Sequence, residues 1–89
     1  MHITIDCDTI QDHASFHRAF SSRLHLPGFY GDNIDALFDC LTSLPEKTTI
    51  RLMHAESLIH NLGSYGRAAI NAITRAEREN PELLTVLMT

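Results

Sequence analysis

The sequence predicts an α/β fold in which a three-stranded parallel sheet packs against about four helices, in a single domain covering residues 1–89. Three apolar or β-branched runs are separated by segments with helical periodicity, and strands joined by helices normally pair in parallel. The chain has 89 residues, 44% of them hydrophobic, which suits one small globular domain.

The first half of the chain predicts one strand and two helices. A strand is expected over residues 2–7, where apolar side chains occupy alternate positions. Asp12 or Ser15 can cap the helix that follows. Apolar residues repeat along one face of that helix: Phe16, Ala19, Phe20 and Leu24. A loop containing proline and glycine is expected over residues 25–31, and a second helix from about Asn33 to Ser43.

The second half predicts two further strands and two helices. We expect a strand over residues 48–53, a short helix over 54–62 and a longer helix over 64–79. The last strand, within residues 83–88, is continuously apolar except for Thr85. Such a run is typical of a strand that is covered on both faces, or is at least central in its sheet.

Charge and composition favour a protein partner over other partners. Eleven acidic and seven basic residues give a net charge of −4, which repels nucleic acid and attracts basic proteins. No apolar run reaches the roughly 18–20 residues of a membrane span. Met1 leads directly into the first strand without a leader, so we expect a cytoplasmic protein whose Cys7 and Cys40 are free thiols in the core.

The second predicted helix has two chemically different faces. At about 100° per residue, one face is apolar and should contact the core. Its members are Ile34, Leu37, Cys40 and Leu41. Asp35, Asp39 and Thr42 share the opposite face, and Phe38 falls on the border. Because residues 24–46 contain no lysine or arginine, this acidic face has no neighbouring cation in the sequence.

Two interpretations of this acidic face remain open on geometry alone. Aromatic side chains beside carboxylates are typical of tight protein interfaces, and here Phe29, Tyr30 and Phe38 are the aromatic residues. Alternatively, Asp35 suits the helix dipole and Asp39 is an ordinary solvated residue. The dipole explains Asp39 less well, because Asp39 lies beyond the first turn.

The segment Leu26–Thr42 resembles the barstar family of ribonuclease inhibitors. The family pattern has Leu-Pro, then Tyr-Gly, an acidic residue and Asn-Leu-Asp-Ala-Leu-Trp-Asp-Cys-Leu-Thr. This chain has LPGFYGDNIDALFDCLT at the same positions. Chain length and element order also agree with the family, so the resemblance extends, more weakly, over the whole chain.

The resemblance implies a partner-binding role for seven residues. Asp39 would be the main mimic of a substrate phosphate, and Asp35 would pair with another basic group of the nuclease. The other implied contacts are Phe29, Asn33, Phe38, Thr42 and Ser43. The implied partner is a basic ribonuclease or a toxin nuclease domain, bound by a chain that is monomeric when free.

Four departures from the family pattern suggest a partner other than barnase itself. Phe29 replaces a tyrosine and Phe38 a tryptophan, while Ser43-Leu44 stands for Gly-Trp. The family also has a partner-facing glutamate on its last helix. Here the nearby positions are Arg75-Ala76-Glu77, and the sequence does not decide which of them takes that place.

Other functions are less well supported by the sequence. His13 and His17 have the i, i+4 spacing of a zinc pair, but no further ligand is obvious, so surface histidines are expected and neither a metal nor a cofactor. An enzyme is not expected, because Cys40 lies with core leucines and the paired aspartates lie on a convex helix face. A protein-binding adaptor of the same fold, without inhibitory action, remains the alternative.

Overall fold

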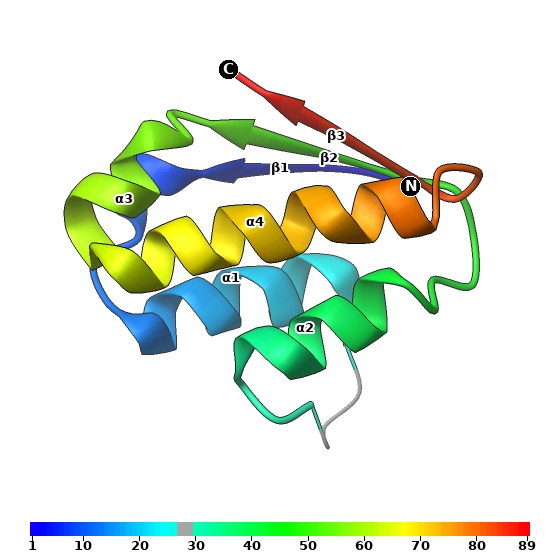
Figure 1. Cartoon of the computed structure of the whole chain (residues 1–89), viewed down its shortest axis with the longest axis horizontal. Coiled ribbons are helices and arrows are strands. Elements are labelled where there is room, and N and C mark those ends of the chain that lie inside the picture. The colour runs from blue at the N-terminus through cyan, green and yellow to red at the C-terminus, as the bar shows by residue number, and fades with distance from the viewer. Residues whose placement is uncertain (27–29) are drawn as a thin grey trace.

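The computed structural model describes residues 1–26 and 30–89. The elements follow one another as β1 (His2–Asp6), the short 3-10 helix η1 (Cys7–Thr9), α1 (His13–Leu24), α2 (Ile34–Leu41), β2 (Thr48–Met53), α3 (Glu56–Leu62), α4 (Ser64–Glu79) and β3 (Leu84–Met88). The three strands form one parallel sheet in the order β1-β2-β3, and the helices lie along one side of it (Figure 1). The predicted fold class is therefore confirmed.

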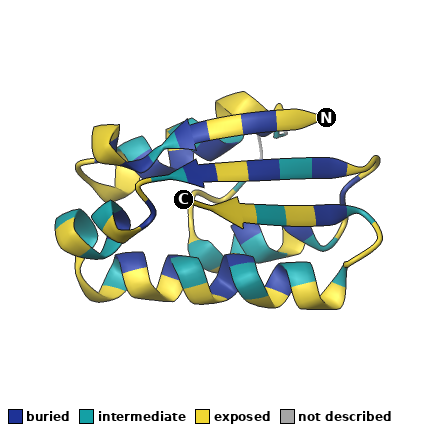
Figure 2. Ribbon diagram, turned by 90° about the horizontal axis from the view of Figure 1, so that it is seen from above, coloured by how far each residue is buried: buried dark blue, intermediate teal, exposed yellow. Residues whose placement is uncertain are grey.

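The sheet buries one face and exposes the other. Ile3 of β1 pairs with Ile50 of β2, which in turn pairs with Val86 of β3, so matching side chains share a face. Ile3 and Ile50 are buried toward the helices, whereas Thr4 and Arg51, one position further along their strands, are exposed. Figure 2 looks onto the exposed face, where buried residues alternate with intermediate or exposed ones along β1 and β2.

The last strand differs from its prediction. β3 is an edge strand, because β2 takes the central place and pairs with both neighbours. Only Leu84 is fully buried, and the side chains of Leu87 and Met88 are 43% and 39% exposed. The prediction of a covered or central strand was therefore wrong. A continuous apolar run indicates a strand, but it does not determine the place of that strand in the sheet.

The helices build the core from their predicted apolar faces. Asp12 caps α1 by accepting the backbone N–H of Ser15, whose hydroxyl accepts the backbone N–H of Asp12 in return, so the two candidate caps act together. The largest fully buried helical side chains converge beneath the sheet: Phe16, Phe20, Leu37, Leu41, Leu58 and Ile73. This packing holds α2 against α4 at the surface that lies opposite the sheet (Figure 1).

Candidate functional site

Helix α2 begins with a side-chain cap supplied by Asn33. The Asn33 side-chain oxygen Oδ1 accepts the backbone N–H of Ala36 at 2.8 Å, and the side-chain Nδ2 donates to the Gly31 carbonyl at 3.1 Å. These bonds satisfy a helix-end donor and fix the turn before it. Asn33, which the resemblance implied as a partner contact, therefore has a clear structural role of its own.

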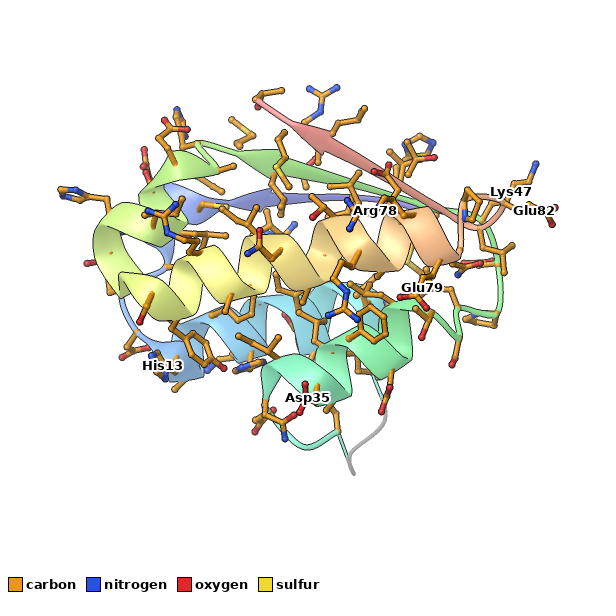
Figure 3. The ribbon with its side chains drawn as sticks, viewed as in Figure 1. His13, Asp35, Lys47, Arg78, Glu79 and Glu82 are labelled. Carbon is orange, nitrogen blue, oxygen red and sulfur yellow. The ribbon has the colours of Figure 1, made fainter. Side chains whose placement is uncertain are left out.

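The two faces of α2 separate as predicted. Leu37 and Leu41 are fully buried, while Asp35 and Asp39 are both exposed. Asp35 lies on the outer side of α2, away from the sheet (Figure 3). Within residues 1–26 and 30–89, neither carboxylate forms an ion pair. The acidic face therefore presents two carboxylates without an ion-pair partner among the described residues, on a helix whose opposite face packs in the core.

Cys40 is less buried than its place in the sequence pattern suggested. It is half-buried and lines a groove of about 300 Å³ together with Leu24, Leu26, Ser43 and Leu44, among others. Partial burial, with the nearby Asp39 charge, raises the pKa of the Cys40 thiol. Cys7 is fully buried, and burial raises its pKa to about 11. Both cysteines are free and protonated at neutral pH, which makes them poor nucleophiles.

The C-terminal end of α2 is shorter than predicted. The helix ends at Leu41, with Thr42 as its cap, rather than at Ser43. The Thr42 hydroxyl bonds back to the carbonyls of Phe38 and Asp39, at 3.0 and 3.2 Å. The Thr42 hydroxyl therefore donates its proton within the helix, although its oxygen can still accept a hydrogen bond from a partner. Ser43 is exposed at the end of the acidic face, and Phe29 lies outside the described residues.

Phe38 lies between the acidic face and helix α4. It is partly buried against the core, and the Arg75 guanidinium carbon lies 4.8 Å from the centre of its ring. This distance is within the range of a cation–π contact. The aromatic side chain that the sequence placed on the border of α2 is therefore held in position by α4.

A buried polar network supports the chain segment just before α2. His17 of α1 is 2% exposed, and its Nδ1 and Nε2 atoms lie 2.6 Å from the Tyr30 hydroxyl and 2.5 Å from the Tyr65 hydroxyl. His13 stacks on Tyr65 with ring centres 3.6 Å apart. The network joins α1 and α4 to Tyr30, so it holds in place the chain segment that leads into α2.

His17 was wrongly predicted to be a surface histidine. Both of its ring nitrogens are engaged by tyrosines, so neither is free to coordinate a metal without breaking the network. The sequence did contain a signal of burial, because His17 lies three and seven residues before the core residues Phe20 and Leu24, on the same face of α1.

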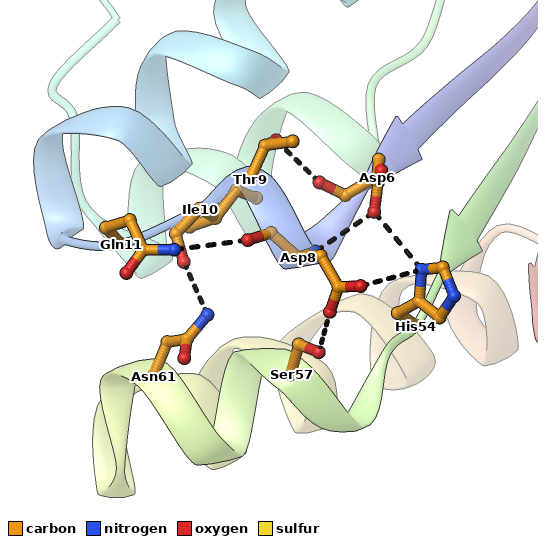
Figure 4. Close-up of polar contacts among 8 residues, drawn as sticks. All are labelled: Asp6, Asp8, Thr9, Ile10, Gln11, His54, Ser57 and Asn61. Carbon is orange, nitrogen blue, oxygen red and sulfur yellow. Dashed lines mark hydrogen bonds and ion pairs between the residues drawn. The ribbon is translucent and has the colours of Figure 1, made fainter.

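Another cluster could offer metal ligands at the carboxyl end of the sheet. His54 Nδ1 lies 3.2 Å from Asp6 and 3.3 Å from Asp8 (Figure 4). These three residues form the group with metal-ligand spacing within the described part of the chain. The hydrogen bond between His54 and Asp6 raises the pKa of His54 and lowers the pKa of Asp6. Asp8 also accepts the Ser57 hydroxyl, so the cluster links η1 to the start of α3. All three side chains are exposed, and the pairing of His54 with the two aspartates accounts for their arrangement. We therefore assign this cluster no metal ion.

The three α4 positions that the sequence left open, Arg75, Ala76 and Glu77, lie in different surroundings. Ala76 is fully buried. The Glu77 carboxylate accepts the backbone N–H of Val86 at 2.7 Å and so serves the edge strand. Arg75 is exposed, and its guanidinium lies over the Phe38 ring of α2.

No helix in the described part of the chain is long and apolar enough to cross a membrane.

The fold and the site together define a small α/β protein that presents the anionic face of α2 beside the partly buried ring of Phe38. The family model described as "Barstar (barnase inhibitor)" matches residues 1–88, and the chain belongs to this family. A Bacillus subtilis (strain 168) protein named "Putative ribonuclease inhibitor YrdF" is 33% identical over 78 residues, which cover 86% of each chain. Members of the family are inhibitors rather than enzymes, which agrees with the class of protein that the sequence predicted.

Proposed function

We propose that this chain inhibits a ribonuclease by inserting the acidic face of α2 into the enzyme's substrate-binding cleft. The proposal rests on Asp35 and Asp39, which are exposed on the capped helix α2 and form no ion pair within the described part of the chain. A ribonuclease needs cationic groups to bind and stabilise phosphate, and carboxylates can take the place of phosphate oxygens. Membership of the Barstar family supports this function.

The roles within the proposed interface are unequal. Asp39 lies in the middle of the exposed face and would be most completely desolvated, whereas Asp35 would pair nearer the edge. Phe38 would add apolar contact area, and Ser43 would line the end of the face. Asn33 and Thr42 would act mainly by holding α2 in shape, because their side chains already bond within it. Phe29 would contact the enzyme from the preceding loop.

The proposed partner is a basic ribonuclease or a toxin nuclease domain in the cytoplasm, bound by one copy of the chain. Burying two carboxylates is favourable only where the partner supplies cations with matching geometry. A partner with a strongly basic cleft provides them, and it also attracts this chain of net charge −4 before contact.

The first test measures how much Asp39 contributes to binding. Barnase is the probe, because the family description names it. The departures at Phe29 and Phe38 predict that barnase binds more weakly than the chain's own partner, but through the same acidic face. By titration calorimetry, Asp39→Ala should weaken binding by about 2 kcal/mol or more, since the nuclease cations would be left unpaired, and Asp35→Ala should have the next largest effect.

The matched control is Glu82→Ala, which removes the same charge at an exposed turn far from α2 (Figure 3). Its affinity should stay close to that of the wild type. If Asp39→Ala and Glu82→Ala bind as tightly as the wild type, the acidic face is not the binding surface and the proposal is wrong.

A further inference from the structure

Helices α2 and α4 form a groove beside the acidic face. Its volume is about 340 Å³, and both helices contribute side chains to its wall. The lining residues are Ile34, Asp35, Phe38, Ala68, Asn71, Ala72 and Arg75. The groove therefore brings a carboxylate of α2 and a guanidinium of α4 to one surface feature, with an aromatic ring between them.

Arg75 is held in place but remains accessible. Its guanidinium lies over the Phe38 ring, and its Nη2 atom is 3.9 Å from the Glu79 carboxylate one turn further along α4. The Arg75 side chain is still 59% exposed. A guanidinium has five N–H donors, so a distant pairing with Glu79 leaves most of them for another acceptor.

The three α4 positions after Arg75 offer no alternative cation at this place. Ala76 is buried, and Glu77 is bonded to the edge strand. Arg78 lies on the sheet side of the helix (Figure 3). The cation at the edge of the α2 face is therefore contributed by Arg75.

We propose that Arg75 binds an acidic side chain of the nuclease partner, so that the interface has an anionic centre on α2 and a cationic edge on α4. This inference rests on the proposed function and specifies the partner further. A nuclease that is basic throughout its rim would meet Arg75 with a like charge, and juxtaposed like charges oppose binding. The preferred partner therefore has a basic cleft with a carboxylate at the rim that contacts the α2–α4 groove.

The experiment is a charge-exchange cycle with barnase as the probe. Exposed lysines and arginines around its active site are replaced by glutamate one at a time. Each form is titrated with the wild-type inhibitor, with Arg75→Glu and with Arg78→Glu. Arg78→Glu is the matched control, because it makes the same charge change on the same helix away from α2. Binding is measured directly, since these replacements also reduce RNA cleavage.

Arg75→Glu should bind unmodified barnase more tightly than the wild type does. At least one glutamate form should show the reverse preference, with a coupling of about tenfold. Arg78→Glu should follow the wild type on every form. If Arg75→Glu does not fold by circular dichroism, Arg75→Gln tests the same preference with a smaller expected effect.

The failures of the two proposals are distinguishable. If the wild type binds and Asp39→Ala weakens binding, but Arg75→Glu ranks all nuclease forms as the wild type does, the Arg75 inference alone is wrong. An Arg78→Glu effect as large as that of Arg75→Glu also overturns it, because the effect is then one of net charge. If no form binds the wild type, the chain does not inhibit a barnase-like nuclease, and this inference fails together with that form of the proposed function.

Discussion

His17 is a buried histidine that bonds to a tyrosine through each ring nitrogen, and its burial has a consequence for stability. Desolvation lowers the pKa of His17 below its usual 6.5, an effect that nearby His13 reinforces and Asp32 opposes. In the unfolded chain the same side chain takes up a proton more readily. The stability that depends on neutral His17 is therefore complete above pH 6.5 and decreases as the pH falls below that value.

This difference predicts the acid limb of the stability curve. Between pH 6.5 and about 5, above the range where carboxylates titrate, the wild-type melting temperature should fall. His17→Gln keeps a donor and an acceptor but cannot titrate, so its melting temperature should be lower at pH 7 and should change less over this interval. The check is calorimetry at several pH values.

His60→Gln is the matched control, because His60 is exposed at the end of α3. It should keep the wild-type slope. His54 is expected to act in the opposite direction, since the bond to Asp6 raises its pKa, and its contribution is lost as the pH rises above 6.5. Equal slopes for the wild type and His17→Gln would contradict the assignment to His17.

The contact between α3 and α4 depends on a glycine inside a helix. A methyl group added at Gly66 would overlap the carbonyl oxygen of Leu58, a backbone atom that cannot move aside cheaply. Glycine in a helix interior normally costs about 1 kcal/mol relative to alanine. At Gly66 the close approach of the two helices outweighs that propensity.

Gly66→Ala should therefore destabilise the fold by about 2 kcal/mol or more, as expected for overpacking against backbone. Urea unfolding monitored by circular dichroism measures the change. Gly63→Ala adds the same methyl group where nothing lies within 4 Å, but at φ +61° and ψ −130°, so it should cost backbone strain of about 1–3 kcal/mol without any overlap. A Gly66→Ala protein as stable as the wild type would show that the helices do not pack so closely.

Local patterns predicted the elements better than their arrangement. The alternation of Ile3 and Ile5, and the helical repeat from Phe16 to Leu24, located β1 and α1 because burial imposes their periods directly. The edge position of β3 could not be predicted in this way, since strand order depends on contacts between distant segments. The acidic face of α2 was predicted from spacing, but the position of Arg75 over Phe38 required the packing of α4 on α2.

The charge distribution of the whole chain favours an encounter with a basic partner at the acidic face. The net charge is −4, and residues 24–46, which include the acidic face, contain no lysine or arginine. A basic nuclease would be attracted before the surfaces touch, and dissolved salt would screen that attraction.

The association rate should therefore fall about tenfold or more between low and high ionic strength, while the dissociation rate changes much less. Stopped-flow mixing with barnase measures both rates. Asp39→Ala should show a shallower salt dependence than Glu82→Ala, because the charge near the contact contributes most. Rates that do not respond to salt would argue against electrostatic steering.

If α2 closes a nuclease active site, the chain must stop RNA cleavage when it binds. Steady-state cleavage by barnase is measured over a range of RNA concentrations while the wild-type chain is added to saturation. Because inhibitor and RNA would compete for one site, sub-saturating inhibitor should raise the apparent KM and leave kcat unchanged. A large excess of inhibitor over a fixed RNA concentration should abolish cleavage. Saturating binding that leaves RNA cleavage at the rate of the free enzyme would contradict it and would identify the chain as a non-inhibitory binding protein.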